Sequence, residues 1–272
     1  MRTYLSGAIA YIEESGDELE RARLAGLLGR PQPEPRIART LAVRQNEDGG
    51  YPYGMIPGRP SAIGATVAGL QWLHDLRLTT GGIVERAVGY LLSVQRPEGT
   101  WDETPAVMKF DPPRALRPGL LGGRLHSTAL VAFWLARVIG PGHDTVARAC
   151  KALRAQRWSE WPVDEPVGTT VLITAVGALV EGPTGPMASG GLGVLSGRAA
   201  DVWTGETMAD LLSAVAVTRI APDQPLVTGA IARLRAAQRP DGGWTSDQSR
   251  DRDVDLSLRA LGALLALGVS TA

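Results

Sequence analysis

The residues best placed to do chemistry lie at the starts of apolar segments of the chain. When four of these segments are aligned on a hydroxyl residue, the aligned positions are Thr66, Thr128, Thr170 and Ser257. Two residues before each hydroxyl lie Gly64, His126, Gly168 and Asp255. An ionisable side chain at a helix start is exposed to free backbone N–H groups and to the positive end of the helix dipole. His126 and Asp255 are therefore the first candidates for acid–base chemistry.

The elements that must position these residues repeat along the chain. Three segments follow the pattern Q-x-x-[DE]-G-x-[YW], and we call them the signature segments: 45–51, 95–101 and 238–244. A degenerate copy starts at Gln156, and successive starts are 50, 61 and 82 residues apart. The last interval leaves room for a further unit around Trp203 whose signature has decayed. Repetition at this spacing indicates stacked supersecondary units.

Helical patterns flank the signature segments. Amphipathic patterns precede them and predict outer helices over 83–95, 144–156 and 226–238. More uniformly apolar patterns, typical of buried helices, predict inner helices over 65–76, 127–139, 169–180, 206–217 and 256–267. The glycine-rich run 190–197 is interpreted as a loop between helices. Because hairpin signals are missing and the Gly and Pro clusters fall between helices, the chain is predicted to be all-α.

Alternating outer and inner helices can bury their faces only against neighbouring hairpins. Closing such an array into a ring removes its open ends. We therefore predict an alpha-alpha toroid of five or six hairpins, formed by residues 1–272 as a single domain. An N-terminal helical segment covers residues 1–30, and the repeats cover about 35–268.

The signature segments resemble the QW repeats of squalene-hopene and oxidosqualene cyclases and of protein prenyltransferase β subunits. This resemblance extends over about residues 35–268 and implies the same toroid. In that family the glutamine amide lies near the aromatic ring and ties one helix end to its neighbour. The resemblance therefore implies structural roles for Gln95, Trp101, Gln238 and Trp244.

Residues 253–257, with the sequence DVDLS, resemble the D-x-D-D-[TS] motif of class II terpenoid cyclases, whose third residue protonates an alkene or epoxide. The resemblance implies that Asp255 is this acid and Asp253 the first carboxylate of the motif. Leu256 replaces the fourth carboxylate, so the acid would need support from Asp253, Asp251 or His126. The alternative is that Asp253 caps the last inner helix and Asp255 stabilises its first turn.

Three aromatic side chains are candidates for substrate binding. Trp72 and Trp134 each lie six residues after an aligned threonine, and Phe133 precedes Trp134. Their faces could stabilise a carbocation, although aromatic residues make up only 5% of the chain, which is low for a polycyclisation pocket. The alternative is that these rings belong to the core. His74 and His143 are expected to face solvent or to cap helices.

The segment 102–125 is long for a connection between a signature segment and its inner helix. It is rich in proline and carries the basic residues Lys109, Arg114, Arg117 and Arg124. Long ordered connections often act as lids, and arginines such as Arg124 could hold a diphosphate through bidentate contacts. A solvated loop is the equally simple alternative.

Composition excludes several other functions. Lys plus Arg and Asp plus Glu are both 28, so charge gives no reason to expect nucleic-acid binding. The single cysteine, Cys150, excludes an internal disulfide and lies in a predicted outer helix, so the Asp–Cys–His zinc site that the prenyltransferase resemblance implies is not reproduced. No cofactor is expected, and Mg²⁺ would take part only with a diphosphate substrate. The N-terminal residues lack a signal-peptide pattern, and no window is apolar enough to span a membrane, which predicts a cytoplasmic protein.

These observations predict a small class II terpenoid-cyclase-like enzyme that starts the cyclisation of a linear isoprenoid by protonation. The large cyclases of that family carry two helical domains, whereas this chain has length for one, so the predicted partner is a small hydrophobic isoprenoid. A homo-oligomer or a partner subunit stays open. The alternatives are a non-catalytic toroid that binds a hydrophobic small molecule and a protein-interaction subunit, which an apolar surface on an outer helix would favour.

Overall fold

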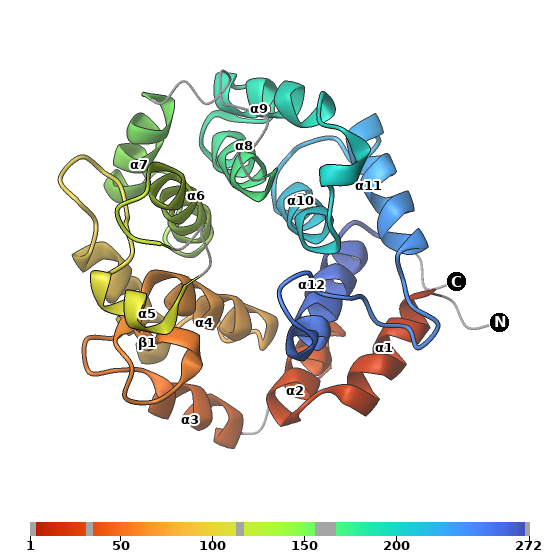
Figure 1. Ribbon diagram of the computed structural model, residues 1–272, viewed down its shortest axis with the longest axis horizontal. Helices are drawn as coiled ribbons and strands as arrows, with labels where there is room; N and C mark the ends of the chain where they lie inside the picture. The colour runs from red at the N-terminus through yellow and green to blue at the C-terminus, as the bar shows by residue number, and fades with distance from the viewer. Residues whose placement is uncertain (1–3, 31–34, 113–116, 156–166, 270–272) are drawn as a thin grey trace. The chain divides into compact units, whose positions relative to one another are not determined.

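The computed structural model describes residues 4–30, 35–112, 117–155 and 167–269, and α-helices dominate them (Figure 1). The chain divides into two compact units, which we describe separately. The terminal unit comprises Met1–Pro31 and Pro166–Ala272, and the middle unit comprises Gln32–Glu165.

The middle unit contains five of the described helices. In chain order they are α3 (Pro35–Arg44), α4 (Ile63–Asp75), α5 (Gly82–Ser93), α6 (Leu121–Val138) and α7 (Asp144–Arg154). Helix α4 packs on α5, α6 packs on α7, and α4 and α6 also pack together. The described strands are two residues long and pair antiparallel: β1 (Tyr51–Pro52) and β2 (Ser61–Ala62). Short 3-10 helices cover η1 (Tyr53–Met55) and η2 (Pro105–Phe110).

The terminal unit joins the two ends of the chain. Its helices are α1 (Tyr4–Ser15), α2 (Glu18–Leu27), α8 (Val167–Glu181), α9 (Pro186–Ser196), α10 (Gly205–Val217), α11 (Pro225–Ala236) and α12 (Asp253–Ala266), with the 3-10 helices η5 (Ala200–Val202) and η6 (Arg250–Arg252). Helix α8 packs on α9, and α10 packs on α8, α11 and α12. The first two helices pack against the last, α12 (Figure 1).

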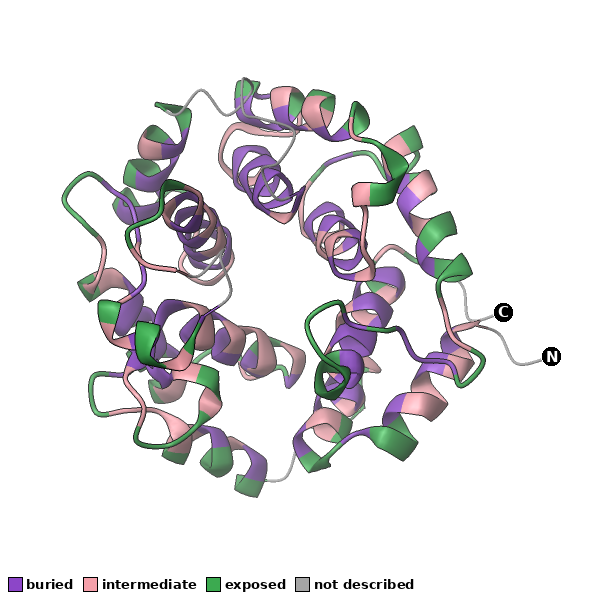
Figure 2. Ribbon diagram, viewed as in Figure 1, coloured by how far each residue is buried: buried purple, intermediate pink, exposed green. Residues whose placement is uncertain are grey.

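Burial separates two kinds of helix, as predicted. The inner helices, α4, α6, α8, α10 and α12, carry long runs of buried apolar residues. Helices α1, α7, α9 and α11 bury one stripe and leave the rest to solvent, so they appear with more green than the inner helices in Figure 2. The predicted inner helices over 65–76, 169–180, 206–217 and 256–267 match the observed ones within three residues at each end.

The glutamines of the signature segments tie consecutive elements together. Gln45, Gln95 and Gln238 each donate from Nε2 to the carbonyl of the glycine four residues later, at 2.7–3.1 Å. Each Nε2 also reaches the first turn of another helix, at the carbonyls of Ile83, Thr145 and Tyr4. The degenerate copy at 156–161 lies outside the described residues.

The aromatic rings of the signature segments fill a repeated slot. The indole N–H of Trp101 donates to Leu91 O at 2.7 Å, and that of Trp244 donates to Leu234 O at 2.6 Å. Both rings are at most 1% exposed. Their backbone N–H groups donate to the aligned hydroxyls of Thr128 and Ser257, as that of Tyr51 does to Thr66. Three of the four aligned hydroxyls are therefore part of the scaffold.

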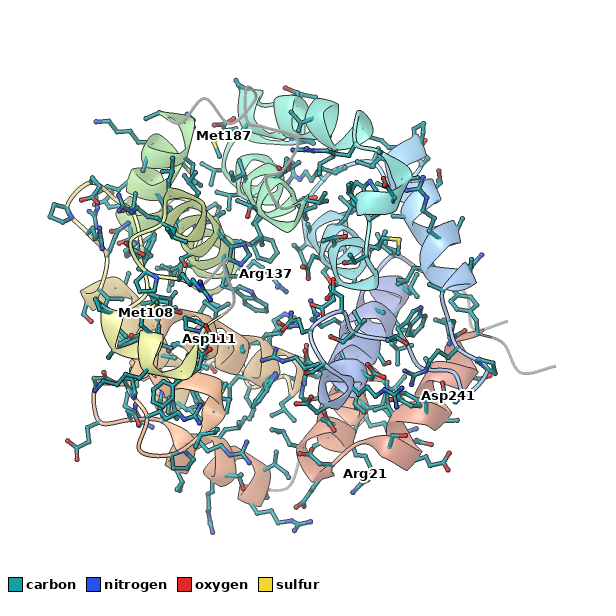
Figure 3. The ribbon with its side chains drawn as sticks, in the orientation of Figure 1. Arg21, Met108, Asp111, Arg137, Met187 and Asp241 are labelled. Atoms are coloured by element: carbon teal, nitrogen blue, oxygen red, sulfur yellow. The ribbon has the colours of Figure 1, made fainter. Side chains whose placement is uncertain are left out.

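The interpretation of 190–197 as a loop is wrong, because α9 runs through it. Its glycines serve close packing. A Cβ on Gly191 would overlap the Thr174 hydroxyl of α8, and a Cβ on Gly177 of α8 would overlap Met187 of α9, labelled in Figure 3. The two helices approach too closely for larger side chains, so glycine here is selected by packing and not by flexibility.

Candidate active site

A cluster of charged side chains lies where α2, α10 and α12 meet in the terminal unit. We call it the acid cluster. Its members are three carboxyl groups and two guanidinium groups: Glu206, Asp210, Asp255, Arg23 and Arg259. Glu206 and Asp210 are one turn apart near the start of α10, and Asp255 and Arg259 have the same spacing on α12. Figure 1 shows these helices side by side, with the segment that leads into α12 curling beside them.

Asp255 is held between two arginines. Its Oδ1 accepts from Arg23 Nη1 at 2.7 Å, and its Oδ2 lies 3.5 Å from Arg259 Nε. Burial acts to raise the pKa of Asp255, but the two guanidinium groups outweigh it and hold that pKa below its ordinary value. Asp255 is thus an ionised partner of Arg23, which is only 1% exposed. Its predicted role as the acid stays a prediction, and these surroundings do not favour it.

Glu206 anchors the segment before α12. Its Oε1 accepts from the Ser246 hydroxyl at 2.5 Å, and its Oε2 accepts from Gln248 Nε2 at 2.8 Å and Arg259 Nη2 at 3.0 Å. These three donors fix the position of the Glu206 carboxyl group. Beside it, the pKa of Asp247 is raised by desolvation and by the negative charge of Glu206.

Asp210 differs from both. Its Oδ1 accepts from Arg259 Nη1 at 2.6 Å, while no donor in the described part of the chain lies within reach of its Oδ2. The side chain is 36% exposed, so this oxygen is accessible. Partial burial raises the pKa of Asp210 and the charges of Glu206 and Asp255 add to the rise, against Arg259. Asp210 is the carboxyl group of the cluster best placed to hold a proton.

The prediction that Asp253 caps the last inner helix is wrong. Arg252 occupies the N-cap position, and Asp253 already has helical dihedral angles. Its carboxylate accepts from the Ser246 backbone at 2.8 Å and pairs with Arg239. Asp253 therefore holds the loop before α12. Asp251 lies exposed in η6, and the bond to Ser249 lowers its pKa. Neither carboxyl has a contact with Asp255 among those described, and their predicted catalytic roles stay predictions.

His126 lies in the middle unit and not at a helix start. Helix α6 begins at Leu121, earlier than predicted, so His126 is in its second turn. Burial lowers the pKa of His126 to about 4, which keeps the imidazole neutral at pH 7. A catalytic role for His126 stays a prediction.

Phe133 and Trp134 form an aromatic corner near the end of α6. Their rings meet edge to face, with ring centres 6.0 Å apart, and the guanidinium of Arg137, labelled in Figure 3, lies 4.3 Å from the Trp134 ring centre. Both rings are at most 6% exposed. With their faces covered by neighbouring side chains, the core alternative describes them better than a substrate wall does.

His74 was expected to face solvent or to cap a helix, and it is exposed, with its ring edge-on to Trp134 of this corner. Its Nε2 lies 3.0 Å from Arg137 Nη2, so the ring nitrogen must accept. Desolvation, and then the charge of Arg137, lower the pKa of His74 to about 4. His74 and Arg137 border a pocket of about 300 Å³ between α4, α5 and α6. His143 does cap a helix, since its ring accepts from Thr145 N at 3.2 Å.

The predicted lid is anchored at both described ends. Asp102 pairs with Arg96 at 2.9 Å and with Arg124 at 3.5 Å, and it accepts from Gly119 N. Arg124 is thus engaged with its own loop. Arg117 pairs with Asp111, labelled in Figure 3, at 2.8 Å. Trp72 is partly exposed on α4. Arg114 lies outside the described residues, and the diphosphate-binding and substrate-binding roles of this group stay predictions.

Within the described residues, no three His, Cys, Asp or Glu side chains are grouped so that they could hold a metal ion. Cys150 is buried in α7. None of the helices in the described ranges is both long and apolar enough to cross a membrane.

Solved structures share this architecture. A protein from Actinoplanes superposes with a TM-score of 0.67 at 20% identity, over 97% of this chain and 98% of that one. MstE, a type II terpene cyclase from Scytonema, superposes in its apo form with a TM-score of 0.66 at 14% identity, over 97% of both chains. The fold is that of a type II terpene cyclase. The predicted fold class, an all-α helical toroid, is thereby confirmed.

A variant of MstE bound to its substrate, geranylgeranyl dihydroxybenzoate, superposes with a TM-score of 0.64 at 13% identity, over 97% of this chain and 96% of that one. No family model and no curated protein matches the sequence.

Sequence reasoning selected Asp255 but missed the rest of the acid cluster. A signal was present, because Glu206, Asp210 and Arg259 interrupt two helices that are otherwise apolar. Charged residues on a buried helix are rare unless they are paired. Nothing in the sequence pairs Arg23 with Asp255, which lies 232 residues away.

Proposed function

We propose that this protein is an enzyme that starts the cyclisation of a linear isoprenoid by protonating a terminal alkene. The observation that carries the proposal is the acid cluster, which lies on two inner helices of a chain with the fold of type II terpene cyclases. Three carboxyl groups face two guanidinium groups there, so one carboxyl group exceeds the available counter-charges. Such a cluster can hold a proton at neutral pH.

The reaction asks for no metal. A carboxylic acid supplies the proton, the alkene becomes a tertiary carbocation, and ring closure ends when a proton leaves or water adds. The substrate class follows from the MstE complex with geranylgeranyl dihydroxybenzoate, which superposes over 97% of this chain. We therefore assign a prenylated aromatic acid or a linear prenyl diphosphate as substrate.

A protein-interaction role has less support. Within the described residues, Val43 of α3 is the one large apolar side chain that α1, α3, α5, α7, α9 or α11 exposes. A single residue makes no docking surface.

The test is incubation of the purified protein in D₂O with linear prenyl diphosphates and prenylated hydroxybenzoates, followed by mass spectrometry. Protonation-started cyclisation yields a cyclic product that keeps its head group and gains a deuterium at the former alkene terminus. Loss of the diphosphate without deuterium uptake would show ionisation instead. If no substrate is converted, the enzyme proposal fails and ligand binding, measured by calorimetry, becomes the better description.

A further inference from the structure

We propose that Asp210, and not Asp255, donates the proton. This inference rests on the proposed function for its chemistry, but the geometry that selects Asp210 stands by itself. The transferable proton needs a carboxyl oxygen that is free of donors and open to a ligand. It also needs a neighbour that stabilises the carboxylate left behind.

Asp210 Oδ2 meets the first condition best within the described residues, because it accepts no hydrogen bond and its side chain is 36% exposed, against 24% for Asp255 and 10% for Glu206. Both oxygens of Glu206 accept hydrogen bonds, and both oxygens of Asp255 face guanidinium groups at 2.7 and 3.5 Å. Asp210 uses Oδ1 for Arg259 and leaves Oδ2 without a donor. A proton on Oδ2 therefore displaces no existing bond.

The second condition is met by Arg259. Its Nη1 lies 2.6 Å from Asp210 Oδ1, and its Nη2 lies 3.0 Å from Glu206. Glu206 and Asp255 hold this guanidinium from two other sides, which makes them positioning residues. Because Arg259 is fixed before the reaction, it can stabilise the Asp210 carboxylate without rearrangement.

The step balances as a simple proton transfer. The O–H bond of Asp210 breaks, the alkene π pair forms a C–H bond at the CH carbon of the terminal double bond, and the positive charge is left on the dimethyl-substituted carbon. Asp210 becomes a carboxylate paired with Arg259. When the cascade ends, a proton leaves the substrate or a water molecule that adds to it, and Asp210 regains its proton from solvent through the exposed Oδ2.

The first test compares Asp210→Asn, Asp255→Asn and Asp247→Asn with Asp223→Asn as a control, since Asp223 is exposed in the connection between α10 and α11. Asparagine keeps the Oδ1 acceptor for Arg259 but has no acidic proton. We expect Asp210→Asn to lower kcat by about 10²–10⁴-fold with little change in KM. Full activity in Asp210→Asn, or its loss in Asp247→Asn alone, would overturn the assignment.

The second test does not need turnover. The carboxyl carbons of aspartates are labelled with ¹³C, and the signal lost in Asp210→Asn is followed by NMR as pH changes. The proposal expects this signal to titrate above the ordinary aspartate value of about 3.9 and the Asp255 signal below it. An Asp210 signal that titrates with or below that of Asp223 would overturn the proposal. Failure of the enzyme proposal would instead show as a lack of product from the unmodified protein, whatever this titration gives.

Discussion

Two carboxyl groups near inner helix starts, one buried and one half-buried, show how differently an acidic side chain can be used. In the middle unit, Glu103 is 3% exposed and accepts from Ile63 N at 2.9 Å and Gly64 N at 2.7 Å, at the start of α4. It replaces the missing side-chain cap of that helix. In the terminal unit, Asp255 contacts the guanidinium groups of Arg23 and Arg259. Arg259 also binds Asp210, which leaves its other carboxyl oxygen without a hydrogen bond.

The pKa directions of these two carboxyl groups are opposite. Desolvation raises the pKa of Glu103 in spite of the amides of Gly64 and Ile63. The arginines lower that of Asp255 in spite of its burial. Burial therefore does not mark a reactive acid. What matters is whether counter-charges or amides surround the group and whether an oxygen is left over.

The largest expected effect concerns the scaffold that both regions share. Trp101→Ala in the middle unit and Trp244→Ala in the terminal unit should each lower the free energy of unfolding by about 3–5 kcal/mol, because each removes a buried ring and its indole bond. Urea denaturation followed by circular dichroism measures this. If either variant lost activity but kept its stability, that tryptophan would belong to the site and not to the scaffold.

The second effect is expected when an ion pair of the acid cluster is removed. Asp255→Asn leaves Arg23 buried without its counter-ion, so we expect a loss of about 3 kcal/mol at pH 7, the lower end of the range for buried pairs, since Asp255 is 24% exposed. Because the folded pKa lies below the unfolded one, the stabilisation by Asp255 is present above the unfolded pKa and is lost as pH falls through the folded pKa. The difference in unfolding free energy between the two proteins, measured by urea titration, should therefore narrow as pH is lowered from 7 through the acidic range. A difference in unfolding free energy that did not change with pH would contradict an ionised Asp255.

The third effect tests Glu103, whose pKa is shifted in the opposite direction to that of Asp255. Glu103→Ala leaves two buried amides without an acceptor and should cost about 1–3 kcal/mol, whereas the neutral Glu103→Gln should cost less. Because the folded pKa of Glu103 is raised, its contribution is full below the unfolded pKa and is lost as pH rises through the folded one. The stability gap between the unmodified protein and Glu103→Gln should therefore shrink with rising pH, which thermal melts from pH 4 to pH 8 can measure. A stability difference that widened with rising pH would mean that Glu103 is ionised in the folded protein.

The smallest effect concerns Tyr51, the aromatic residue of the first signature segment. Tyr51 occupies the slot of Trp101 and Trp244, but its buried hydroxyl has no hydrogen-bond partner among the described residues, and burial raises its pKa to about 12. Tyr51→Phe removes this unsatisfied group, so we expect a gain of about 1 kcal/mol. Differential scanning calorimetry measures it, with Trp101→Phe as the matched variant that should lose stability along with its bond to Leu91. Destabilisation by Tyr51→Phe would mean that the phenol has a partner.

The helices could be predicted from sequence because the spacing of apolar residues along a segment shows which of its faces is buried. The patterns over 83–95 and 206–217 are good examples, since the observed α5 and α10 agree within two residues. The glycine run 190–197 failed because composition alone cannot separate a flexible loop from a tightly packed helix. The α6 start failed for a similar reason: Gly122 and Gly123 read as a connection, yet they are the first turn.

The site was predictable only in part. The segment around Asp255 carried a recognisable pattern, and its place in the first turn of α12 was expected. Arg259 lies one turn after Asp255 on the same helix, a spacing that the sequence shows. Arg23 reaches Asp255 only through tertiary packing, which no local pattern encodes. The distinction between Asp210 and Asp255 depends on which oxygen meets a donor, and that is a property of three-dimensional contacts.

The ion pair between Arg23 and Asp255 joins residues that are 232 positions apart. On the ribosome, Arg23 emerges roughly 10–50 s before Asp255, at about 5–20 residues per second. Through that interval α2 has neither its counter-ion nor α12 to pack against, and the charged side chain must stay hydrated. The acid cluster therefore forms only after α12 has been synthesised.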